Sequence, residues 1–92
     1  MPTNSELASV RIQHAIDIGT AERVPVRSGF PEGQRVRYRF ASTTRWSYGT
    51  VLCWLRLAGD VGPAIAWDGV RGAHGDWGWF GRNGDSLQAV KS

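Results

Sequence analysis

Short apolar runs, cut at close intervals by glycine-containing turns, are the feature that most limits how this chain can fold. The 92 residues include twelve glycines but only four prolines. So many positions of free backbone rotation suit tight turns between strands better than long helices. Turn signals stand at 59–62, at Asp68-Gly69 and at 83–85. A chain of this length has room for one core, so we expect a single, mainly β domain.

Residues 33–90, beyond a turn-rich hinge, carry the β pattern. In the first segment, 35–40, three arginines alternate with three apolar residues, so a strand there would turn guanidinium groups outward and apolar groups inward. Further antiparallel strands are predicted at 49–57, 64–67 and 77–80, with a last one beginning at Val90. The alternation predicts one shared core that contains Val36, Tyr38, Val51, Ile65 and Leu87.

Residues 1–28 form an N-terminal extension with two open interpretations. Thr3 and Glu6 have the spacing of a capping box, which indicates a short helix. From 10 to 18, however, β-branched residues alternate with polar ones, which indicates a strand. We favour the strand at 10–18 and keep the helix as the alternative. A second alternating run follows at 23–27, where a proline limits pairing to a sheet edge.

The order of these motifs is similar to that of Tudor-like domains, which have SH3-type barrels. The segments that carry the similarity are Gly33-Gln34-Arg35-Val36-Arg37-Tyr38, Tyr48-Gly49-Thr50-Val51, Ala64-Ile65-Ala66-Trp67-Asp68-Gly69, Trp79-Phe80 and Leu87. The resemblance covers 33–90 and implies a small antiparallel barrel. It also implies an aromatic cage that holds a methylated cation by cation–π attraction. The cage positions are Phe40, Tyr48 and Trp67, while Val70 stands where caged members often carry an aromatic residue.

Arginine dominates the positive charge of the chain. Ten arginines and one lysine give a net charge of +3, and the arginine fork binds phosphates and stacks on aromatic rings. On a strand, Arg35, Arg37 and Arg39 would lie roughly 6.6 Å apart on one face, close to the phosphate spacing of a single strand. The other predicted nucleic-acid contacts are Arg45, Arg71, Trp46, Tyr48 and Trp54, the aromatic ones by stacking on bases.

The sequence therefore predicts a non-catalytic binding module, either a nucleic-acid-binding or a regulatory protein. A solvated strand face, with the arginines paired to Asp and Glu, is the structural alternative. A second functional class is a protein-interaction module, in which an aromatic groove around Tyr48, Trp67 and Trp77 holds a peptide or a second copy of the chain. In that class a homo-oligomer is possible.

An enzymatic alternative rests on similarity to the plasmid-type (type II) dihydrofolate reductases. Their short chains also form SH3-type barrels, and four of them surround one active pore. Their Val-Gln-Ile-Tyr pore run is missing here, and Trp77-Gly78-Trp79-Phe80 stands at the equivalent strand. We therefore expect no enzyme activity.

No pattern indicates a catalytic, metal or cofactor site. His14 and His74 lie outside any metal-ligand spacing, and four aspartates stand beside turn glycines. The lone Cys53 cannot form an intrachain disulfide, and we expect a buried, unreactive thiol. No apolar run reaches the length of a membrane span and no signal-like segment opens the chain. We therefore expect no cofactor, no membrane partner and a cytoplasmic location.

Overall fold

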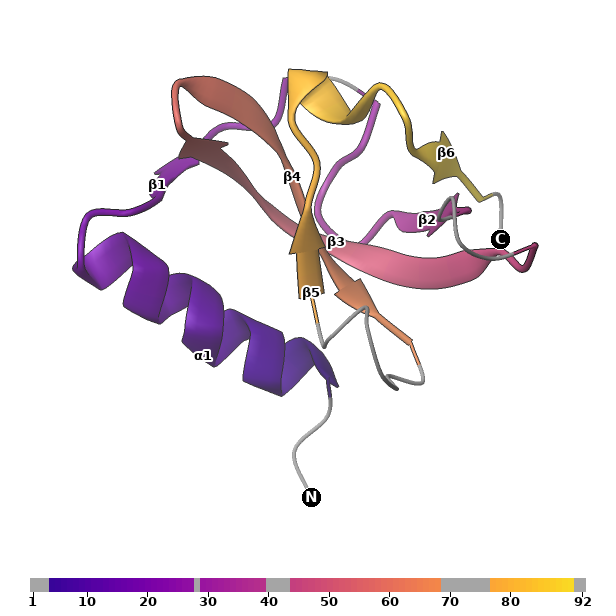
Figure 1. The fold of residues 1–92 in the computed structure, drawn as a ribbon, viewed down its shortest axis with the longest axis horizontal. Coiled ribbons are helices and arrows are strands. Elements are labelled where there is room, and N and C mark those ends of the chain that lie inside the picture. Colours follow the sequence, from indigo (N-terminus) through magenta and orange to yellow (C-terminus); the bar gives the residue numbers. More distant parts are fainter. Residues whose placement is uncertain (1–3, 28, 40–43, 69–76, 91–92) are drawn as a thin grey trace.

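The computed structural model describes residues 4–27, 29–39, 44–68 and 77–90 (Figure 1). The helix α1 (Asn4–Asp17) precedes β1 (Glu22–Val24), β2 (Arg35–Tyr38), β3 (Ser47–Leu57), β4 (Asp60–Trp67), β5 (Trp77–Trp79), a 3-10 turn (Arg82–Gly84) and β6 (Gln88–Ala89). The strands of this described part form one six-stranded antiparallel sheet. The prediction of a mainly β domain is confirmed.

The sheet is a meander whose last strand returns to its beginning. The strand order is β5-β4-β3-β2-β6, and β1 pairs with the far end of β3. The β3–β4 hairpin turns through Ala58 and Gly59, which both have positive φ angles of 51° and 82°. Such angles at both central residues match the twist of the flanking strands. The outermost strands, β5 and β6, do not pair with each other within the described ranges, so the sheet is open.

A bulge in β3 changes which of its side chains point to each face of the sheet. Val51 pairs with Ile65 but Cys53 pairs with Ala64, so one extra residue stands in β3 between these pairs. An extra residue reverses the in–out alternation beyond it. Val51 and Trp54 therefore pack on one face, although they are three positions apart.

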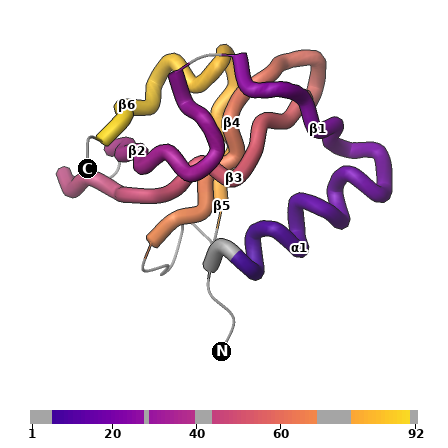
Figure 2. The backbone as a smooth tube through the Cα atoms, turned by 180° about the vertical axis from the view of Figure 1, so that it is seen from behind, coloured from indigo at the N-terminus to yellow at the C-terminus, as the bar shows by residue number. Residues whose placement is uncertain are grey.

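Two cores lie on the two faces of the sheet. The first core contains Val36, Val51, Trp54, Val61, Ile65, Trp67 and Leu87. The second core contains Ile12, Ala21, Cys53, Leu55 and Ala64. In the second core α1 covers the sheet at β4 and β5. Viewed from either side, α1 and β1 lie at one end of the molecule and β2 and β6 at the other (Figures 1 and 2).

The predicted core is confirmed for four of its five residues. Val36, Val51, Ile65 and Leu87 are buried together in the first core. Tyr38 is half-buried against this core, with its ring edge-to-face to Phe80 at a centroid distance of 4.9 Å.

The prediction of a strand at 10–18 is wrong, because residues 10–17 lie within α1 and Ile18 follows the end of this helix. Ala8 and Ile12, one helical turn apart, are buried, whereas Val10 and Ile18 are 69% and 62% exposed. Packing of this small apolar stripe on the sheet outweighs the strand preference of the β-branched residues. The extension still adds a strand, since β1 overlaps the second alternating run at Arg23 and Val24 and ends before Pro25. Within the described ranges, α1 is too short and too polar to cross a membrane.

Candidate nucleic-acid interface

One face of β2 and the start of β3 gathers arginine and aromatic side chains. We call Arg35, Arg37, Arg39, Trp46 and Tyr48 the arginine face. In the sheet register Arg37 lies opposite Tyr48 on one side and Gln88 on the other. Val36, between the first two arginines, is fully buried on the opposite face. The arginine face thus continues the sheet face that α1 covers at β4 and β5, and none of the described helices packs on it.

Trp46 is the centre of this face. The guanidinium carbon of Arg37 lies 4.1 Å from the centroid of the Trp46 ring, and that of Arg39 lies 5.3 Å away. Both distances are within the range of cation–π attraction. Two positive charges therefore converge on one half-buried indole ring.

Arg37 is also fixed by the last strand. Its Nε and Nη2 atoms donate hydrogen bonds of 3.0 and 2.8 Å to Oε1 of Gln88. Because the Gln88 amide is neutral, these bonds orient the guanidinium group without neutralising its charge. Sequence reasoning missed Gln88, because the last strand was expected to begin at Val90, whereas β6 consists of Gln88 and Ala89 and pairs with β2.

Arg35 has a different environment. Its Nη1 atom donates to Oγ1 of Thr50 at 2.8 Å and to Oδ1 of Asp68 at 2.9 Å, and Nη2 donates to the other oxygen of Asp68. The hydrogen bond to Asp68 raises the pKa of Arg35. Arg35 therefore matches the structural alternative given by the sequence, in which the arginines pair with acidic residues. The positive charge of the face is therefore concentrated at Arg37 and Arg39.

Tyr48 contributes an exposed ring to the arginine face. Its side chain is 41% exposed, and its carbonyl oxygen accepts a 2.9 Å hydrogen bond from the backbone N–H of Asp68. Asp68 thus stands beside Tyr48, on the side away from Arg37. A carboxylate borders the face there.

Trp54 was predicted to stack on bases, and that prediction is wrong. Its side chain is fully buried in the first core, and its Nε1 atom donates a 2.9 Å hydrogen bond to the carbonyl oxygen of Phe30. The bulge in β3 turns it inward, where an uninterrupted alternation would have turned it outward.

The predicted aromatic cage is not assembled by the residues that the structure describes. Trp67 pairs with Gly49 and packs in the first core, edge-to-face with Phe80 at 5.8 Å. It therefore lies on the opposite face of the sheet from Tyr48. Trp77 is half-buried against the second core. The predicted groove of Tyr48, Trp67 and Trp77 is also wrong, because Trp67 and Tyr48 lie on opposite faces of the sheet. Phe40, Val70 and Arg71 lie outside the described residues.

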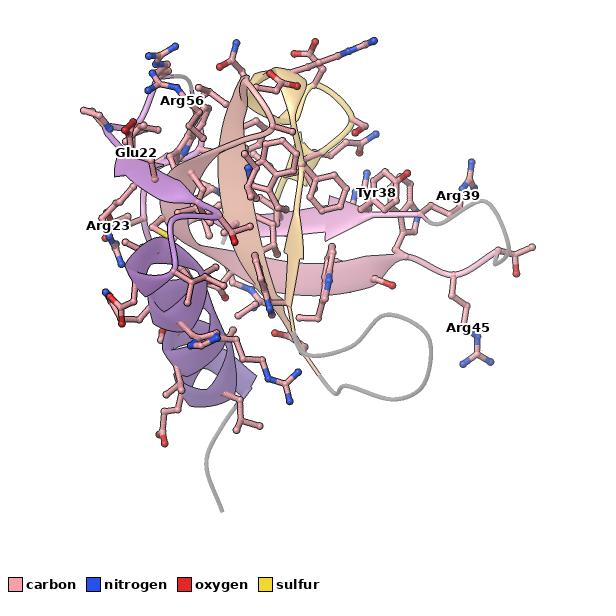
Figure 3. All side chains as sticks on the ribbon, turned by 60° about the vertical axis from the view of Figure 1, so that its left-hand side comes forward. Glu22, Arg23, Tyr38, Arg39, Arg45 and Arg56 are labelled. Atoms are coloured by element: carbon pink, nitrogen blue, oxygen red, sulfur yellow. The ribbon has the colours of Figure 1, made fainter. Side chains whose placement is uncertain are left out.

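The two ends of the molecule differ in how their arginines are arranged. Arg39 and Arg45 point away from the body at the end that carries β2 (Figure 3). At the other end Arg56 forms an ion pair with Glu22, at 2.6 Å between Nη1 and Oε1 (Figure 3). Arg45, next to Trp46 in the chain, is exposed. In Figure 3 Arg45 and Arg39 point in opposite directions, so Arg45 is not counted among the residues of the arginine face.

Cys53 is buried in the second core, as expected. Desolvation raises the pKa of its thiol, which favours the unreactive, protonated form. In the described part of the chain, no three residues of the His, Cys, Asp and Glu types come together as metal ligands would.

Comparisons of this chain with protein-family models, with curated proteins and with solved structures find no match. The geometry of the arginine face is thus the basis for assigning a function.

Proposed function

We propose that this protein is a nucleic-acid-binding module, without a catalytic role, that holds its ligand on the arginine face. The observation that carries the proposal is the placement of Arg37 and Arg39 around Trp46, at 4.1 and 5.3 Å. Guanidinium groups bind phosphates, and indole rings stack on bases. A surface that combines both can bind the two parts of a nucleotide at once.

The orientation of Arg37 supports this proposal. Gln88 and Trp46 hold its guanidinium group in place before any ligand arrives. A side chain that is already ordered loses less conformational entropy on binding. In contrast, Arg35 donates to the Asp68 carboxylate, which competes with phosphate for the same donors.

The strand order supports a barrel of the SH3/Tudor type. A four-stranded meander, a 3-10 turn and a last strand that returns to β2 follow the running order to which the sequence is similar. Barrels of this kind often contact nucleic acid on an exposed strand face. In this proposal α1 is an addition that covers the other half of the same sheet face.

The experiment that tests the proposal is a salt series of binding to labelled DNA and RNA. Affinity should fall steeply with salt, because phosphate contacts release counterions. Arg39→Ala should reduce the slope of log K against log salt by about 0.7 on single strands or about 0.9 on duplexes. Arg56→Ala removes an equal charge from the opposite end of the protein, so it is the matched control and should leave the slope unchanged.

Two results would contradict the proposal. If wild-type protein binds no nucleic acid at low salt, where the electrostatic attraction is strongest, the protein-interaction module takes its place. If Arg56→Ala lowers the slope as much as Arg39→Ala, the binding is a general effect of net charge.

A further inference from the structure

We infer that the ligand of the arginine face is a single strand of nucleic acid, with bases stacked on Trp46 and Tyr48 and phosphates held by Arg37 and Arg39. This inference rests on the proposed function and names its ligand class. Four points carry it: the positions of Trp46 and Tyr48 along the chain, the Nη1 donors of Arg37, the exposure of Arg39 and the position of Asp68.

Trp46 and Tyr48 stand farther apart along the chain than stacked bases do. Trp46 directly precedes β3 and Tyr48 is the second residue of that strand, and in an extended chain Cα atoms two positions apart are separated by roughly 6.6 Å. Both residues adjoin Arg37, which lies over the Trp46 ring and opposite Tyr48 in the sheet register. Successive bases within a duplex strand rise by only about 3.4 Å, and each is covered on both faces by its neighbours. Only an unstacked strand exposes base faces to aromatic rings.

The donors of Arg37 leave room for a phosphate. A guanidinium group carries five N–H donors, and Gln88 accepts from Nε and Nη2. Among the described residues no acceptor is assigned to the Nη1 group, which can therefore donate to a phosphate while the side chain keeps its place over Trp46. Arg39 is exposed beside the same ring, so a phosphate on either side of a stacked base has a cation within reach.

Asp68 limits the width of the site. Its carboxylate is about half exposed and pairs with Arg35 beside Tyr48. A duplex presents phosphates on two strands and needs a broad positive surface, which would bring phosphates against this carboxylate. A single strand that follows Arg39, Trp46, Arg37 and Tyr48 ends before it.

The test compares one labelled 12-nucleotide sequence as single-stranded DNA, as single-stranded RNA and as duplex DNA, at one low salt concentration. We expect at least one of the two single strands to bind tenfold or more tightly than the duplex. Trp46→Ala should weaken single-strand binding by roughly 5- to 150-fold, whereas Trp46→Phe, which keeps a ring, should retain most of the affinity. Tyr48→Ala should weaken it in the same direction.

Neither core of the described residues includes Trp46, so Trp46→Ala should fold, and an unchanged thermal midpoint verifies this. Duplex binding as tight as single-strand binding, with no effect of Trp46→Ala, would overturn the inference and leave the proposed function standing. Absence of binding to all three ligands would overturn the proposed function itself.

Discussion

Arg37 joins two parts of the chain that are far apart in sequence, because its guanidinium group lies 4.1 Å from the centroid of Trp46 and donates to Gln88. Trp46 directly precedes β3, and Gln88 is the first residue of β6. The three residues therefore meet only when β2 pairs with both strands. Arg37 also connects function to folding, since its orientation depends on the closing strand. The predictions below test the face and the packing that supports it.

The first prediction concerns the carboxylate at the border of the face. Asp68→Asn should release Arg35 and remove a negative charge, so nucleic acid should bind more tightly. The salt slope should then steepen by about 0.7 if Arg35 gains one contact to a single strand. Because the side chains of this ion pair are 39% and 52% exposed and solvent therefore screens it, the free energy of unfolding should fall by less than about 1 kcal/mol.

Glu22→Gln is the matched control for this prediction, since it breaks the exposed ion pair with Arg56 at the other end of the protein. It should leave the affinity and the salt slope unchanged. Equal effects of the two variants would show that Asp68 acts only through net charge.

The second prediction concerns the packing of α1. Ile12 is 1% exposed in the second core, so Ile12→Ala should lower the free energy of unfolding by roughly 2–5 kcal/mol. Val10 is 69% exposed, and Val10→Ala should change the free energy of unfolding by less than about 0.5 kcal/mol. Urea denaturation measures both. A strand at 10–18 would place both side chains on one face, so similar losses would contradict the helix.

The third prediction concerns a close backbone approach between β4 and the segment after β5. A methyl group on Gly62 would overlap the carbonyl oxygen of Phe80, which is backbone and cannot move aside without shifting the chain. Gly62→Ala should therefore cost on the order of 1–3 kcal/mol or more. Gly29→Ala is the control, because no atom lies within 4 Å of its added methyl group. A thermal midpoint that is equal in the two variants would contradict this packing.

The fourth prediction concerns pH. Burial raises the pKa of the Cys53 thiol above its ordinary value of 9.0, so the folded protein keeps a proton that the unfolded chain releases. The resulting stability is fully present below pH 9.0 and is lost as the pH rises toward the folded pKa. Urea denaturation from pH 7 to 10.5 should show a steeper alkaline loss for the wild type than for Cys53→Ala. Parallel curves would mean that the thiol is not desolvated.

The strands of residues 33–90 could be predicted from the sequence because their causes are local. Turn glycines and period-two alternation are written in adjacent residues, and they give the core of Val36, Val51 and Ile65 correctly. The bulge in β3 has no such local signal, because it depends on how β4 pairs. The sequence therefore predicted the wrong face of the sheet for the Trp54 side chain.

The sequence carried a signal for the N-terminal helix, but the pattern that favours a strand was given more weight. The capping-box spacing of Thr3 and Glu6 indicated a helix, but the β-branched alternation of 10–18 favoured a strand. The helical spacing of Ala8, Ile12, Ala15 and Ile16 was not used. Which face is buried depends on the sheet surface that α1 meets. For the site, the common face of the three arginines followed from alternation alone. The partners that distinguish Arg35 from Arg37 did not, because Asp68 and Gln88 lie 33 and 51 positions away.

The most direct test of the central claim is to follow the side-chain N–H signals of the 15N-labelled protein by NMR while unlabelled nucleic acid is added. The indole signal of Trp46 and the Nε signals of Arg37 and Arg39 should shift together. The indole signals of Trp54 and Trp79 should stay in place, because these groups donate to the carbonyl oxygens of Phe30 and Leu55 inside the fold. Shifts confined to α1, or a Trp46 signal that does not move at saturation, would contradict binding on the arginine face.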